Sequence, residues 1–126
     1  MLVFIYGTLK RGCFNHDLIK KEDFICEVET SYKYPMYQLG QPFPYLQNTP
    51  GMGEFIQGEL YEINSASMPQ LDFFEGVPDL YHREKILVKK IGGEKTEYAA
   101  HTYFTSSVLD LPELGRLDMI RMWNDG

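Results

Sequence analysis

The sequence predicts a mixed α+β fold in which a few short helices accompany a small curved sheet or barrel. Antiparallel hairpin patterns recur along the chain, and short helical patterns are interspersed among them. The alternation is too irregular for a doubly wound parallel sheet. A length of 126 residues suits one domain with a real core, so we expect a single domain over residues 1–126.

Composition excludes several classes of protein and partner. A hydrophobic fraction of 44%, with 14% aromatic residues, is too apolar for a disordered chain. The net charge of −6 disfavours nucleic acids and anionic membranes as partners, because both need basic surfaces. The chain shows neither a signal-peptide pattern nor a membrane-spanning apolar run. Cys13 and Cys26 lack metal-site spacing, and two thiols predict a reducing, cytoplasmic location.

The first element is a buried strand that ends in a glycine-punctuated loop. Residues 2–6 form an apolar run, which breaks at Gly7 and again at Gly12. The loop is expected to turn its N–H groups at Gly7, Thr8 and Leu9 towards a cavity, where successive N–H groups bind anions or polarised oxygens. The alternative is an ordinary loop after a strand.

The following segments predict one helix and several strands. Residues 15–22 read as a short helix with Asn15 as its N-cap and with Leu18 and Ile19 facing inward. Residues 24–32 alternate as a half-exposed strand does, with Phe24, Cys26 and Val28 on one side. Prolines limit the next stretch to short strands at 36–39 and 45–47, joined by a turn at Gly40.

A strand over residues 55–63 leads into a second helix. Gly58 within this strand predicts a bulge or a close approach of another backbone. The helix is predicted over residues 65–75, with Met68, Leu71 and Phe74 facing inward at helical spacing. Gly76 suits its C-cap.

The rest of the chain predicts a hairpin and a last helix. Residues 81–90 and 97–104 read as two strands that pair across a turn at Gly92 and Gly93. Residues 115–123 are predicted to form a short helix.

Glu75 is the candidate general base. It lies in the last turn of the second helix, where the partial negative charge of the helix C-terminus opposes ionisation. Nearby Phe73 and Phe74 would add desolvation, which also raises the pKa of a carboxyl group. A pKa raised towards neutrality suits a base that works near pH 7. The alternative is an exposed glutamate that only ends a helix.

Two motifs resemble those of the γ-glutamylcyclotransferase-like superfamily, and most closely its γ-glutamylamine branch. The first is YGTLKRG at residues 6–12, followed by Asn15 and His16. The second is LDFFEG at residues 71–76, followed by LYHR at 80–83. GELY at residues 58–61 resembles the preceding strand of the family, and the similarity extends to about Phe104.

The resemblance implies a barrel-like domain with a cavity at one end, and a cyclotransferase reaction. The α-amine of a γ-glutamyl-amine attacks its own γ-carbonyl, which releases 5-oxoproline and a free amine. Glu75 is then the general acid/base, and the loop from Tyr6 to Leu9 binds the substrate. Tyr6 and Tyr81 would line the pocket, although core packing explains both about as well.

The implied chemistry requires no metal and no organic cofactor. The predicted partner is a small γ-glutamyl compound, and we expect a monomer or weak dimer. The Gly7–Thr8 pair departs from the Gly-Ser loop of glutathione-degrading branches, so the resemblance argues against glutathione and leaves the departing amine open. Lys10 and Arg11 read as solvated loop charges, and the alternative is that they attract an anionic substrate. The three histidines share no motif with a base or metal partner.

Two other functions remain open from the sequence. The same fold can bind a γ-glutamyl-like molecule without turnover. An interaction protein would instead expose aromatic residues such as Phe43, Tyr45 and Trp123.

Overall fold

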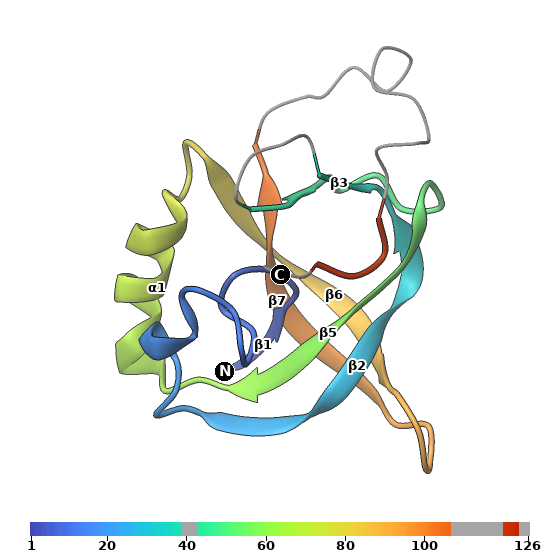
Figure 1. Cartoon of the computed structure of the whole chain (residues 1–126), viewed down its shortest axis with the longest axis horizontal. Coiled ribbons are helices and arrows are strands. Elements are labelled where there is room, and N and C mark those ends of the chain that lie inside the picture. Colours follow the sequence, from blue (N-terminus) through green and yellow to red (C-terminus); the bar gives the residue numbers. More distant parts are fainter. Residues whose placement is uncertain (39–42, 107–119, 124–126) are drawn as a thin grey trace.

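Five strands close into a barrel in the computed structural model, which describes residues 1–38, 43–106 and 120–123. The barrel order is β1-β5-β2-β6-β7 (Figure 1). In chain order the strands are β1 (Leu2–Ile5), β2 (Asp23–Tyr34), β5 (Glu54–Glu62), β6 (Tyr81–Lys90) and β7 (Glu97–Thr105). This arrangement confirms the predicted fold class of a small barrel with few short helices.

The barrel closes where the first strand meets the last. β1 pairs antiparallel with β5 and parallel with β7, where Val3 lies opposite His101. The Thr102 hydroxyl donates a 3.0 Å hydrogen bond to the Phe4 carbonyl across the same seam. β6 and β7 form the predicted hairpin, and both glycines of its turn have positive φ. The barrel is therefore complete only when the first strand, β1, pairs with the last strand, β7.

Gly58 marks a close approach, as the sequence predicts. A Cβ at this position would lie 2.4 Å from the Ile5 carbonyl oxygen and 2.6 Å from the Phe4 ring. The predicted bulge lies elsewhere. The irregularities are in β2, between Phe24 and Cys26 and between Glu29 and Lys33. The irregularity between Phe24 and Cys26 changes the alternation of side chains along β2. Phe24 is therefore exposed while Val28 is fully buried, so the prediction that they share one side of the strand was wrong.

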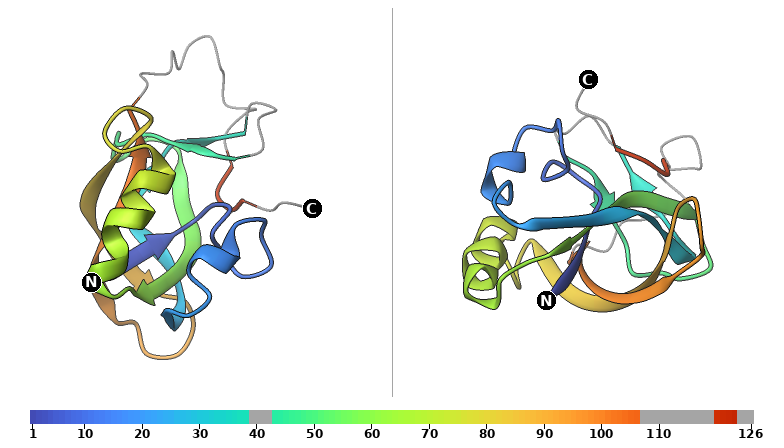
Figure 2. Two further views of the ribbon diagram at one scale, coloured as in Figure 1. Left: turned by 90° about the vertical axis from the view of Figure 1, so that its left-hand side faces the viewer. Right: turned by 90° about the horizontal axis from the view of Figure 1, so that it is seen from below.

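The second helix forms almost as predicted. A 3₁₀ turn, η2 (Ser65–Ser67), leads into α1 (Met68–Glu75), which lies along the outside of the barrel (Figures 1 and 2). Gly76 adopts the left-handed conformation with φ of 69° and donates to the carbonyls of Asp72 and Phe73, which confirms its role as the C-cap.

Helix geometry corrects the predicted inner face of α1. Met68 and Leu71 are buried against the barrel, but Phe74 is 40% exposed. Phe74 follows Met68 by six residues, which turns the helix by about 600° and leaves Phe74 about 120° away from the face of Met68. A step of seven residues nearly restores the direction, so Glu75 lies on the inner face instead.

The first predicted helix is only one 3₁₀ turn, η1 (His16–Leu18). Asn15 makes no capping hydrogen bond there. Its side-chain amide donates instead to the Thr8 hydroxyl at 3.0 Å, and its backbone N–H donates to the Thr8 carbonyl at 2.9 Å. Ile19 is buried as expected, whereas Leu18 is 45% exposed. Asn15 therefore closes the glycine loop rather than starting a helix.

A two-stranded sheet of β3 (Met36–Tyr37) and β4 (Tyr45–Leu46) lies beside one end of the barrel, as predicted from the prolines (Figure 2). The predicted turn at Gly40 lies outside the described residues.

Most of the predicted last helix, residues 115–119, also lies outside the described part of the chain. Residues 120–123 are a bend and not a helix, so that part of the prediction was wrong. The Ile120 N–H donates to the Met36 carbonyl, and the Gln57 N–H donates to the Arg121 carbonyl, each at 2.8 Å. Trp123 is 3% exposed and packs into the barrel core, so it is not the exposed interaction residue that the sequence suggested.

Among the described residues, no helix combines the length and the apolar character that crossing a membrane would require.

Candidate active site

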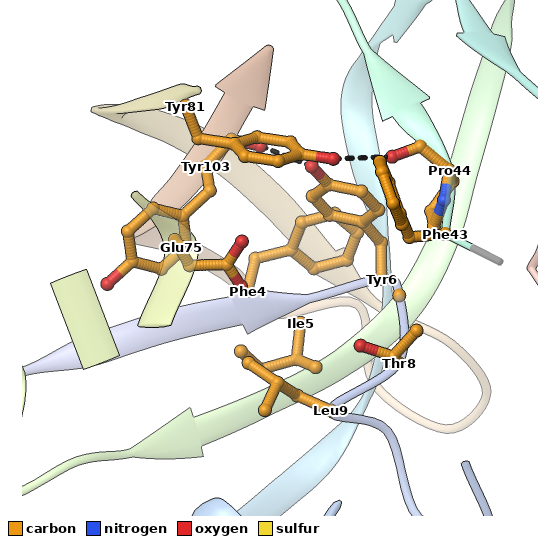
Figure 3. A pocket seen from close by; sticks show the side chains of 11 residues that line it. Phe4, Ile5, Tyr6, Thr8, Leu9, Phe43, Pro44, Glu75, Tyr81 and Tyr103 are labelled. Carbon is orange, nitrogen blue, oxygen red and sulfur yellow. Dashed lines mark hydrogen bonds between the residues drawn. The ribbon is translucent and has the colours of Figure 1, made fainter. Parts of the chain in front are cut away.

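A cavity opens where β1 ends, at the rim of the barrel (Figure 3). All six residues that the sequence proposed as site residues line it, namely Tyr6, Gly7, Thr8, Leu9, Glu75 and Tyr81. The lining also includes five residues that were not among them: Phe4, Ile5, Phe43, Pro44 and Tyr103. The structure therefore brings the glycine loop and the helix end together around one space.

The carbonyl groups of the loop after β1 accept hydrogen bonds from residues that follow in the chain. The carbonyls of Gly7 and Thr8 accept from the N–H groups of Lys10 (3.1 Å) and Asn15 (2.9 Å). The Leu9 carbonyl lies 2.9 Å from Nδ1 of His16. None of the turn, loop and cap hydrogen bonds among the described residues uses the N–H of Gly7, Thr8 or Leu9. Because all three residues line the cavity, their N–H groups are candidates for binding an anion or an oxyanion there.

Glu75 turns its carboxylate into the cavity from the end of α1 (Figure 3). Burial raises the pKa of this carboxyl group to about 7, and the negative charge of Asp72 adds to the rise. The expected direction of the shift agrees with the sequence, but one proposed cause was wrong, because Phe73 is 87% exposed. The side chains of Tyr6, Tyr81 and Tyr103 also line this cavity.

The three tyrosines that line the cavity each donate a hydrogen bond from the hydroxyl group to another group of the protein. Tyr6 donates to the Tyr103 carbonyl, and Tyr81 donates to the Pro44 carbonyl at 2.9 Å (Figure 3). Tyr103 donates to Oδ1 of Asp72 at 2.6 Å. Burial raises the pKa of each phenol above its usual range, and the Glu75 charge adds to the rise. These phenols therefore stay protonated and shape the cavity.

Asp72 connects the helix to the far wall of the cavity. Its second oxygen lies 3.5 Å from Nη2 of Arg83, while its first accepts from Tyr103. One turn of helix separates it from Glu75, so its charge reaches the candidate base. The sequence placed Asp72 in the motif without a role, because its partners lie on β6 and β7, far away in the chain.

A family profile decides which proteins this chain resembles. The profile described as gamma-glutamyl cyclotransferase, AIG2-like, matches residues 3–124. The chain belongs to this family. Membership confirms the resemblance read from the two sequence motifs, and it makes the chain a member of a family of cyclotransferase enzymes.

Curated proteins that are similar to this chain carry the names of gamma-glutamylamine cyclotransferases. The chain is 39% identical over 111 residues to gamma-glutamylaminecyclotransferase A of Danio rerio, covering 83% of this chain and 69% of that protein. It is 36% identical over 94 residues to the human gamma-glutamylaminecyclotransferase, covering 70% of this chain and 61% of that protein. The crystal structure of a mouse AIG2-like protein superposes with a TM-score of 0.86 at 28% identity, over 98% of this chain and 87% of that one.

Several charged or titratable residues of this family member lie away from the cavity lining. Lys10 is 7% exposed and donates from Nζ to the Trp123 carbonyl, so its reading as a solvated charge was wrong. Arg11 pairs with Glu59, its Nε lying 3.4 Å from Oε2. No histidine of the described chain is among the residues that line the cavity. These contacts anchor the loop, and they leave Glu75 as the candidate base of the cavity.

The raised pKa of Glu75 predicts a pH-dependent cost to stability. The folded protein keeps this carboxyl neutral up to about pH 7, whereas the unfolded chain ionises it near pH 4.5. Stability from the neutral form is complete below the lower value and is lost as pH rises through the higher one. Glu75→Gln should therefore unfold less readily than the native chain above pH 7, by up to about 3 kcal/mol. Urea unfolding at pH 4 and pH 8 checks this, and an equal difference at both values would contradict it.

Proposed function

We propose that this protein cleaves γ-glutamyl-amines by intramolecular cyclisation, with Glu75 as the general acid/base. The observation that carries the proposal is the position of Glu75. Its carboxylate, with a pKa near 7, shares a cavity with the donor-rich loop at Gly7–Leu9. Enzymes of this chemistry need a base that can both accept and return a proton near neutral pH.

The reaction balances without water. Glu75 accepts a proton from the α-ammonium group, and the freed amine attacks the γ-carbonyl carbon. The new C–N bond closes the five-membered ring, and the bond to the departing nitrogen breaks as protonated Glu75 returns its proton. The α-nitrogen loses two protons in all, the first to Glu75 and the second to solvent. The departing amine gains two, the first from Glu75 and the second from solvent after release.

The loop stabilises the charge that develops during attack. As the ring closes, the γ-carbonyl oxygen becomes an oxyanion, and fixed N–H donors in a cavity sheltered from water stabilise it strongly. The backbone of Gly7, Thr8 and Leu9 offers such donors on the wall that Glu75 faces. The tyrosine walls hold the substrate in a folded conformation that brings amine and carbonyl together.

Three further expectations accompany this function. The whole chain, residues 1–126, acts as one domain, which the match over residues 3–124 supports. The protein acts as a monomer or weak dimer on a small γ-glutamyl molecule, which size-exclusion chromatography with light scattering checks. Its location is the cytoplasm, a prediction that rests on the sequence.

A panel of γ-glutamyl compounds tests the activity directly. Purified protein is incubated with γ-glutamyl-ε-lysine, γ-glutamylamines, γ-glutamyl dipeptides and glutathione, and 5-oxoproline is measured. We expect product from at least one γ-glutamylamine. Binding of these compounds without product, by folded protein, would favour the alternative of a non-catalytic γ-glutamyl-binding protein.

Removing the charge of Asp72 should shift the pH profile. Asp72 raises the pKa of Glu75, so Asp72→Asn lowers that pKa and also leaves the Arg83 cation without its carboxylate partner. The acidic limb of kcat/KM, set in the native chain by the pKa near 7, should move to lower pH. A pH–rate series checks this, with Asp79→Asn, an exposed carboxylate on the next loop, as the control. An unmoved or raised limb would contradict the role of Asp72.

A further inference from the structure

We propose that Glu59 is a positioning residue, which binds both ends of the glycine loop at residues 6–11 and so aims the N–H groups of that loop. This inference rests on the proposed function and deepens it, because it assigns what holds the loop in its working shape. Glu59 lies on β5 and is not among the described residues that line the cavity. Any effect of Glu59 on the reaction must therefore pass through another residue.

The backbone of Glu59 fixes the start of the glycine loop. Glu59 pairs with Ile5, the last residue of β1, in the antiparallel ladder between β1 and β5. Gly58 permits this close contact, because a Cβ at Gly58 would lie 2.4 Å from the Ile5 carbonyl oxygen. The chain leaves the sheet directly after Ile5, so β5 defines the position from which the loop starts.

The carboxylate of Glu59 fixes the end of the same loop. Its Oε1 accepts a 2.9 Å hydrogen bond from the backbone N–H of Arg11, whereas Nε of Arg11 lies 3.4 Å from Oε2. The shorter contact is thus to the main chain. A hydrogen bond from a backbone N–H to a carboxylate is about twice as strong as one between neutral groups. One residue therefore joins the two ends of the loop that carries the N–H groups of Gly7, Thr8 and Leu9.

The surroundings of Glu59 keep its carboxylate in one place. Glu59 is 8% exposed, and the hydroxyl of Tyr61 donates to its Oε1 at 3.0 Å. Burial, followed by the charge and the hydrogen bond of Glu59, raises the pKa of Tyr61 above its usual range, so this phenol remains a donor. A buried carboxylate cannot follow a displaced loop without leaving hydrogen bonds unmade, so it resists displacement of the loop.

The side chain of Arg11 has other partners, which supply a matched control. Its guanidinium lies 3.7 Å from the centre of the Phe24 ring, and its Nη2 lies 3.8 Å from Oε1 of Glu27. Glu27 is directly opposite Glu59 in the ladder between β2 and β5. The two glutamates thus approach the same arginine, but Glu27 contacts its side chain and Glu59 also binds its backbone.

Glu59→Ala should lower kcat for 5-oxoproline formation by about 10- to 100-fold, while KM changes by less than about threefold. The oxyanion develops only during the reaction, so displaced N–H donors cost turnover and not substrate binding. A shift of about 1 Å suffices for a loss near 10²-fold. Steady-state assays with the γ-glutamylamine that yields most product measure both constants. An unchanged kcat, or a loss confined to KM, would overturn the inference.

Two further variants separate positioning from a general loss of structure. Glu59→Gln keeps an oxygen that can accept from the N–H of Arg11, so kcat should return to within about fivefold of the native value. Glu27→Ala removes the neighbouring carboxylate and should keep native kcat. A loss in Glu59→Gln as large as in Glu59→Ala, or an equal loss in Glu27→Ala, would overturn the inference.

Amide hydrogen exchange tests the role of Glu59 without turnover. The N–H of Lys10 donates to the Gly7 carbonyl within the loop, and the N–H of Ile56, on β5, donates to a buried hydroxyl. In Glu59→Ala the exchange rate of the Lys10 amide should rise at least about tenfold more than that of Ile56. An equal change at the two amides, or none at either, would overturn the inference.

The two measurements keep this inference separate from the proposed function. If native protein forms no 5-oxoproline from any γ-glutamyl compound, the proposed function fails. The exchange rates of the Lys10 and Ile56 amides then decide alone whether Glu59 holds the loop. If native protein forms product, a native kcat in Glu59→Ala would overturn the role of Glu59 and leave the proposed function intact.

Discussion

Glu75→Gln should lower kcat for 5-oxoproline formation by about 10²- to 10⁴-fold, the usual contribution of a general acid/base. Glutamine has nearly the same shape as glutamic acid and cannot accept the proton of the α-ammonium group. The Tyr6 and Tyr81 walls would keep their hydrogen bonds to Tyr103 and Pro44, so the cavity should keep its form. Steady-state assays at pH 8 measure the loss.

Controls separate lost chemistry from lost structure. Glu54→Gln changes an exposed carboxylate on β5 and should keep native kcat. Glu75→Gln should still bind 5-oxoproline, because the loop donors are backbone groups that the substitution leaves in place. Turnover by Glu75→Gln within a few-fold of the native rate would remove Glu75 from the mechanism.

Gly58→Ala should destabilise the fold by about 1–3 kcal/mol, the usual cost of overpacking a core. Adding a side chain to a strand glycine ordinarily stabilises a protein by roughly 0.5–1 kcal/mol. Here the new Cβ would lie 2.4 Å from the Ile5 carbonyl oxygen, so the steric term exceeds that gain. The backbone of β1 must move, and β1 carries the loop of the candidate site. Thermal unfolding should show Tm lower by roughly 4–12 °C.

Gly92→Asn is the matched control for Gly58→Ala. Gly92 has a φ of 79°, and a Cβ there would meet nothing within 4 Å. Asparagine tolerates this left-handed conformation better than most residues, so Tm should change little. A Gly58→Ala variant as stable as Gly92→Asn would show that β1 and β5 can separate at no cost.

The strands and the position of Glu75 could be predicted from the sequence because both depend on local patterns. Alternating runs rich in β-branched and aromatic residues favour strands, and turn glycines such as Gly92 separate them. The position of Glu75 at the end of α1 followed from the capping glycine at Gly76. Its inward direction follows from the seven-residue step from Met68, which puts both residues on one face of α1.

The features that the sequence could not predict depend on long-range partners. Lys10 is buried because its Nζ donates to the carbonyl of Trp123, 113 residues away. Tyr103 lines the cavity because the barrel closes β7 onto β1, which no local pattern specifies. Likewise, Asn15 looks like a helix cap until Thr8 is known to be its partner.

Closure of β1 on β7 also determines when the cavity can form during synthesis. The ribosome releases the glycine loop first, and β1 can pair with β5 once residue 62 has emerged. The wall made by Tyr103 and the seam at Thr102 come only with the last strand. Until then β1 carries an unpaired edge, and β2 carries one until β6 pairs with it. Such edges are the kind of surface that promotes association between nascent chains. Such distant pairing predicts slow folding for a protein of this length, because the loop between the partners must close before their contacts stabilise it.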